Sequence, residues 1–111
     1  RWNCEINFSK QNFRNKILMN NKSFIIRAQK LIAKSFQTQA NLCCSIRRFD
    51  DGVLSFDITH FDKRYGPDGN PHSNRRIIAY NSLSDVDRKL NKIQCFIDKL
   101  LSGEDALIEE N

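Results

Sequence analysis

The chain has 111 residues, of which 40% are apolar and 28% charged, and its formal net charge is +5. This length predicts a single domain, residues 1–111, that can bury a core of its own. No run of about 18 apolar residues is present, so no transmembrane helix is expected. Residues 1–49 carry ten basic side chains and one acidic one, whereas residues 50–111 carry eight basic and twelve acidic ones. Such a basic half favours a polyanionic partner, or is a solvated surface.

Residues 1–22 are predicted to form an N-terminal arm that contains one short strand. Apolar side chains at Trp2, Cys4, Ile6 and Phe8 alternate with polar ones, which is typical of a half-buried strand. The polar stretch that follows is a short helix or a connection. The chain begins with Arg1 rather than Met, and residues 6–49 lack acidic side chains, so import into an organelle is an alternative to a plain intracellular location.

An amphipathic helix is predicted over residues 24–37, with Ser23 as its N-cap. Its apolar stripe consists of Phe24, Ile25, Ala28, Leu31, Ile32 and Phe36. Arg27, Lys30 and Lys34 form a basic line beside this stripe. The line is either a solvated helix face or a track of phosphate contacts.

A β-hairpin is predicted from two apolar runs, residues 42–49 and 53–61, which are joined by a turn that contains Gly52. A three-residue loop with Gly52 in the left-handed conformation pairs Ile46 with Phe56 and gathers the apolar side chains on one face. A two-residue turn would instead place Arg47 on that face. We predict the first register, because the buried face sets the register of a strand.

A long polar loop over residues 62–74, a strand over residues 75–80 and a helix over residues 86–101 complete the core. The helix has the clearest stripe of the chain, Val86, Leu90, Ile93, Ile97 and Leu100. Ser82 or Ser84 is expected to cap its start and Gly103 its end. Residues 104–111 read as a frayed acidic tail.

These elements predict an α+β fold. Three antiparallel strands, or four with the N-terminal strand, pack on two helices in the order β-α-β-β-β-α. Residues 23–103 form the core of this predicted domain, between the arm and the acidic tail.

Sites for chemistry are scarce, and the sequence predicts a protein that is not an enzyme and carries no cofactor or metal. No nucleophile elbow, P-loop, dinucleotide fingerprint or HExxH motif is present. His60 is predicted to be structural rather than part of a site with Asp57, Asp62 and His72.

The four cysteines, Cys4, Cys43, Cys44 and Cys95, include no CxxC pair and predict reduced thiols inside a cell. A disulfide between Cys4 and one of the adjacent pair is the alternative.

Basic pairs at strand ends suggest a binding function. Together with one aromatic residue for base stacking, they predict a nucleic-acid-binding surface around one sheet edge and its loop: Arg47, Arg48, Lys63, Arg64, Tyr65, Arg75 and Arg76. The partner would be DNA or RNA. The pairs could equally guard strand edges against aggregation. The alternative function is a protein–protein interaction module, either a subunit of a larger assembly, which could be an oligomer, or a small inhibitor.

The order helix, three strands, helix resembles the double-stranded RNA-binding domain. The strands and the last helix also resemble AP2-like and integrase arm-type DNA-binding modules, and both resemblances cover about residues 42–101. The basic cluster that the RNA-binding family has at the start of its last helix is replaced here by residues 84–87, Ser-Asp-Val-Asp, and the tryptophan of the AP2-like second strand is absent. No functional residue is therefore transferred from either family.

Overall fold

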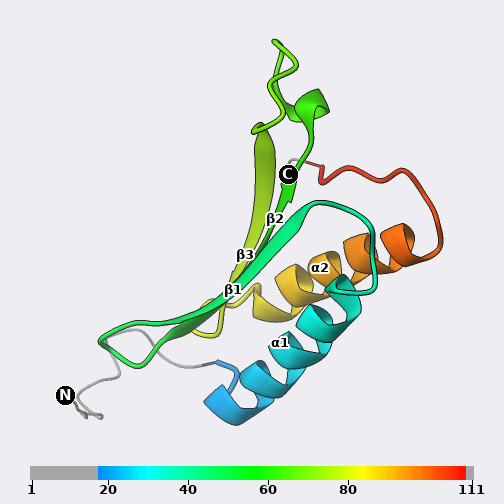
Figure 1. Ribbon diagram of the computed structural model, residues 1–111. Coiled ribbons are helices and arrows are strands. Elements are labelled where there is room, and N and C mark those ends of the chain that lie inside the picture. The colour runs from blue at the N-terminus through cyan, green and yellow to red at the C-terminus, as the bar shows by residue number, and fades with distance from the viewer. Residues whose placement is uncertain (1–17, 110–111) are drawn as a thin grey trace.

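The computed structural model describes residues 18–109 and has the predicted α+β architecture (Figure 1). The elements in chain order are α1 (Asn21–Ser35), β1 (Leu42–Arg48), β2 (Leu54–Phe61), the short 3-10 helix η2 (Lys63–Tyr65), β3 (Asn74–Tyr80) and α2 (Val86–Leu101). The predicted strand at residues 2–8 lies outside the described residues. No helix among residues 18–109 is long and apolar enough to cross a bilayer.

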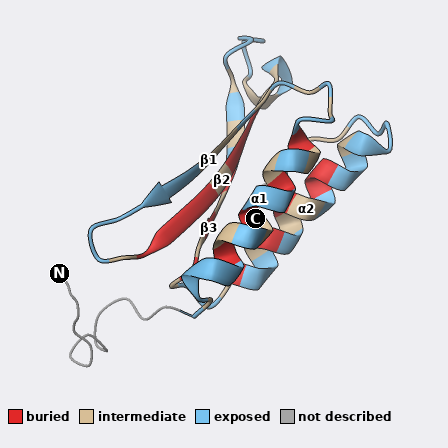
Figure 2. Cartoon of the chain, turned by 60° about the horizontal axis from the view of Figure 1, so that its bottom comes forward, coloured by how far each residue is buried: buried red, intermediate tan, exposed pale blue. Residues whose placement is uncertain are grey.

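The three strands form one antiparallel sheet in the order β1-β2-β3, and both helices cover the same face of it (Figure 2). Ile46 pairs with Phe56, and Gly52 has a φ of 89°, so the predicted three-residue loop and its register are confirmed. Phe56 and Ile58 of the central strand are fully buried under the helices. No helix of residues 18–109 lies on the opposite face of the sheet.

Helix α1 begins three residues earlier than predicted. Asn20 is its N-cap, and the Asn20 Oδ1 atom accepts a hydrogen bond from the Ser23 backbone N–H at 2.8 Å. Ser23 therefore lies in the first turn and is not the cap. The buried side of the helix consists of Phe24, Ala28, Leu31 and Ser35. Phe36, which was predicted to extend the stripe, is 82% exposed because the helix ends at Ser35.

Helix α2 buries a stripe of five apolar side chains against the sheet: Val86, Leu90, Ile93, Phe96 and Ile97. Its N-cap is Asp85 rather than Ser82 or Ser84, and no side chain caps it. The helix ends at Leu101, and Gly103 is the predicted C′ residue, with a φ of 87°. The Gly103 N–H donates to Leu100 O and the Glu104 N–H donates to Lys99 O, which is a Schellman motif. This motif turns the chain back toward the sheet.

Asn81, directly after β3, is a fully buried polar residue that connects the end of β3 by hydrogen bonds to the start of β2 and to the segment before α1. Its Oδ1 atom accepts a hydrogen bond from the Leu54 N–H, and its Nδ2 atom donates to Met19 O and to Asn21 Oδ1. The Asn81 backbone also pairs with Leu54 and accepts from the N–H groups of Leu18 and Met19. Because every group of this amide has a partner, its burial adds to the fold rather than opposing it.

Candidate nucleic-acid interface

The predicted site residues lie at two ends of the sheet rather than around one edge. Arg47 and Arg48 close β1 beside the β1–β2 turn, where both are exposed. The other five, in η2 and at the start of β3, lie at the opposite end, beside the long loop (Figure 1). An antiparallel strand of seven or eight residues separates the two groups by about 20 Å. The prediction that the three basic pairs meet was therefore wrong, because β2 carries the chain from one end to the other.

Adjacent arginines of β3 point to opposite faces of the sheet. Arg75 is paired with His60 on the face that the helices cover, whereas Arg76 is paired with Thr59 on the open face. Arg47 is paired with Ser55 on that same open face. The two side chains of a basic pair on a strand therefore point to different faces of the sheet, because successive strand residues alternate between faces.

Arg64 is held by two carboxylates. Its guanidinium contacts Asp62, with Nη2 2.6 Å from Oδ2, and Asp105, with Nη1 2.8 Å from Oδ2. Hydrogen bonds from Arg64 hold the pKa of Asp62 far below its usual value and also lower the pKa of Asp105. The side chain is exposed but already forms a bidentate pair with the C-terminal segment.

Tyr65 joins His60 to the C-terminal segment. Its hydroxyl oxygen lies 2.7 Å from His60 Nδ1 and accepts a hydrogen bond from the Ile108 N–H at 2.6 Å. The Arg75 guanidinium lies 5.2 Å from the centre of the Tyr65 ring and donates to Ile108 O at 3.1 Å. His60 is 4% exposed, as expected of a structural histidine, and burial lowers its pKa. The hydroxyl and the ring of Tyr65 therefore already contact other residues of the domain, so the ring is not a free surface for base stacking.

Residues 104–109 are not frayed, contrary to the prediction for this part of the tail. Ile108 is only 4% exposed and belongs to the hydrophobic core, with Ala106 packed against it. The segment returns from the end of α2 to the loop end of the sheet, as the red trace in Figure 1 shows. Burial of Ile108 stabilises this segment together with its hydrogen bonds to Tyr65 and Arg75.

A groove of 240 Å³ lies between β3 and the first half of α2. Its lining contains four cations and one carboxylate: Arg75, Arg76, Lys89, Lys92 and Glu109. Ile77 and Ile108 form its apolar floor. Burial, with the nearby charges of Lys89 and Arg88, lowers the pKa of Lys92, as expected where cations crowd together. Positive charge therefore gathers in this groove, among the residues that the structure describes. Another basic hollow, on α1, is lined by Arg27, Lys30 and Lys34, but Arg27 and Lys34 are already paired with carboxylates of α2.

Sequence reasoning found Arg75 and Arg76 but missed the lysines of this groove. Residues 84–87 are not basic, but α2 begins only at Val86. Its first two turns carry Arg88, Lys89 and Lys92. The spacing of Lys89 and Lys92 places both on one side of a helix, and this was the available signal.

Other candidates from the sequence are accounted for by packing. Arg27 pairs with Asp87 and Asn91, and Lys34 pairs with Asp98, so two members of the basic line on α1 hold α2. Asp57 lies on the open sheet face, away from His60, and accepts a hydrogen bond from Ser45.

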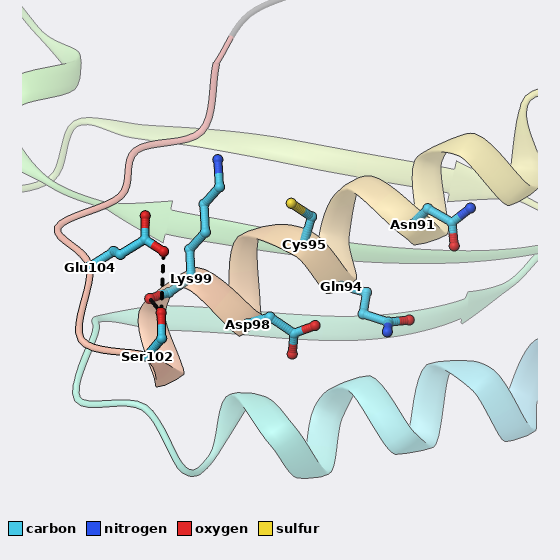
Figure 3. Close-up of a pocket in the computed structure, with 7 residues that line it drawn as sticks. All are labelled: Asn91, Gln94, Cys95, Asp98, Lys99, Ser102 and Glu104. Carbon is cyan, nitrogen blue, oxygen red and sulfur yellow. Dashed lines mark hydrogen bonds between the residues drawn. The ribbon is translucent and has the colours of Figure 1, made fainter.

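A second hollow, of 420 Å³, runs along the outer side of α2 and includes Cys95 and Lys99 (Figure 3). Its lining lacks a histidine that could activate the thiol. Among residues 18–109, no group of three or more His, Cys, Asp or Glu side chains is arranged to hold a metal ion.

In comparisons with known proteins, no family model matches this chain, and neither a curated protein nor a solved structure is detectably similar to it.

Proposed function

We propose that this protein is a small nucleic-acid-binding module whose main phosphate contacts lie in the groove between β3 and α2. One observation carries the proposal: Arg75 and Arg76 from the strand and Lys89 and Lys92 from the helix line a single concavity. Phosphate contacts made by Arg and Lys supply most of the affinity of nucleic-acid-binding proteins. Arg47, Arg48 and Lys63, which are exposed elsewhere, would add weaker contacts.

The proposed setting is the inside of a cell. Cys43, Cys44 and Cys95 are free thiols in the structure, which suits a reducing compartment. The choice between DNA and RNA, and between single and double strands, is left to the binding experiment.

The test is a salt titration of binding to single- and double-stranded DNA and RNA, followed by fluorescence anisotropy. Wild-type protein should bind at least one ligand with a steep negative slope of log K against log salt. The double variant Arg76→Gln/Lys89→Gln should bind more weakly, with a slope for duplex DNA that is smaller by about 2. Arg76 and Lys89 are chosen because the structure does not use them to hold the C-terminal segment.

The matched control is Lys22→Gln/Lys30→Gln. Both lysines lie on α1, which contacts α2, β1 and β2, and neither lines the groove between β3 and α2. This double variant loses the same net charge and should lose much less affinity. Equal losses in the two variants would mean that binding follows net charge and not the groove. No binding by wild-type protein at low salt would remove nucleic acid as the partner.

A protein–protein interaction module is the second candidate, and a separate surface favours it. A hollow of 600 Å³ beside the β1–β2 turn is lined by Phe49, Val53, Tyr80 and Leu83, together with the polar residues Asp50, Asp51 and Ser82. Phe49 is 37% and Leu83 48% exposed, as is common at protein interfaces. Sedimentation of wild-type protein and of Phe49→Ser/Leu83→Ser tests self-association. A monomeric wild-type chain that captures no partner would argue against this candidate.

A further inference from the structure

The C-terminal segment is attached to the domain in an unusual way, because side chains alone hold it. Beyond Glu104, no backbone–backbone hydrogen bond involves residues 105–109 in the described part of the chain. Side chains of the domain provide the bonds instead: Tyr65 to Ile108 N–H, Arg75 to Ile108 O, Lys92 to Glu109 O and Arg64 to Asp105. The side chain of Ile108 fills the core below them. A protein holds an extended peptide ligand by contacts of this kind.

The same segment overlaps the candidate interface. Arg75 and Lys92 line the groove and also donate hydrogen bonds to the backbone of Ile108 and Glu109. Glu109 is the one carboxylate residue that residues 18–109 contribute to the lining, and its charge acts on the ammonium group of Lys92. Glu109 thus lies beside cations that a phosphate group in the groove would contact.

We infer that the C-terminal segment, residues 105–109, is a built-in competitor for the groove, so that a polyanion must displace Glu109 in order to bind. This inference rests on the proposed function and adds a form of regulation to it. When a phosphate enters, Arg75 and Lys92 exchange tail contacts for phosphate contacts. Anything that weakens the hold on Glu109 then strengthens binding, because the two occupants share the same cations.

Two tail variants with equal charge change test this inference in the full-length protein. Glu109→Gln removes the carboxylate in the groove. Glu104→Gln removes a carboxylate at the end of α2, where Ser102 Oγ donates to Glu104 Oε2 over 3.2 Å, outside the groove (Figure 3). Both variants gain the same long-range attraction for a polyanion, so any difference between them is local to the groove.

Binding of the nucleic acid that wild-type protein prefers is then measured by anisotropy at fixed salt. The expected result is affinity about threefold higher for Glu109→Gln than for Glu104→Gln, as for loss of one local charge contact. Equal affinities of the two variants, with wild-type binding intact, would overturn the competition and leave the proposed function standing. No binding by any of the three proteins would remove the proposed function and the competition together.

Discussion

Two segments join the sheet at opposite ends and are held by different means. At the hairpin end, residues 18–20 lead into α1, and Asn81 secures them through a fully buried amide and backbone hydrogen bonds. At the loop end, residues 105–109 are secured by Tyr65, Arg75 and Arg64, and two of these three are charged. Bonds of the first kind are exchanged only when the domain unfolds, whereas bonds from exposed charges can be given to another anion. We therefore call the attachment of residues 18–20 permanent and that of residues 105–109 exchangeable.

The largest effect on stability is expected at the permanent attachment of residues 18–20. Asn81→Ala leaves the buried Leu54 N–H and Met19 O without their side-chain partners. Unfolding free energy should fall by about 3 kcal/mol, since each unsatisfied buried group costs about 1–3 kcal/mol. Urea denaturation followed by circular dichroism measures the change. A loss below about 1 kcal/mol would show that Asn81 does not secure this end.

The exchangeable attachment of residues 105–109 should depend on one apolar side chain, Ile108. Ile108→Ala removes a buried side chain and should cost about 2 kcal/mol. This is at the low end for such truncations, because no backbone–backbone hydrogen bond of the described chain fixes residues 105–109, and the segment can shift to fill the space. Leu107→Ala, the matched change in a neighbouring residue that is only partly buried, should cost clearly less. Equal losses in the same denaturation experiment would mean that Ile108 does not anchor the segment.

Acid should loosen the loop end through His60. Burial is the largest cause of the lowered pKa of His60, and Arg64 lowers it further, while Asp62 and Asp105 act in the opposite direction. The folded pKa therefore lies below the ordinary value of 6.5, so the unfolded chain binds more protons. Stability that is present above pH 6.5 should be lost as the pH falls toward the folded pKa. The pKa values of Asp62 and Asp105 are also lowered, and their contribution is lost only below about pH 4.

The measurement is the urea midpoint of wild-type protein and of His60→Gln at pH 7 and pH 5. Wild-type protein should lose more stability between these two values than His60→Gln, which has no group that titrates at this position. The difference should be smaller than the effect of Ile108→Ala, because only one partly compensated group is involved. The same pH dependence in both proteins would assign it to other groups.

Much of the hairpin end was predictable from the sequence, because alternation and turn chemistry act locally there. Gly52 and the apolar residues of β1 and β2 determined the register, and the stripe of α2 identified the helix. The cap of α1 was missed because Asn20 and Ser23 are both good capping residues, and the choice between them depends on the tertiary hold on residues 18–20.

The loop end was harder to predict, because its contacts join residues that are far apart in the sequence. Arg64 and Asp105 are 41 residues apart, and so charge composition could not show that this arginine is already paired. The apolar run Ala106-Leu107-Ile108 in an acidic tail was the only sequence sign that the tail packs. Strand alternation could have separated Arg75 from Arg76, since neighbouring strand residues face opposite sides.

The most direct test of this comparison is native-state hydrogen exchange of two backbone amides, Leu54 and Ile108, each of which donates to a side chain. If the tail is an exchangeable segment, the Ile108 amide should exchange through local opening, with a free energy well below that of global unfolding. The Leu54 amide, bound to Asn81, should exchange only near the global value. Exchange of both amides at the global value would contradict the account, because the tail would then be as permanent a part of the fold as the sheet.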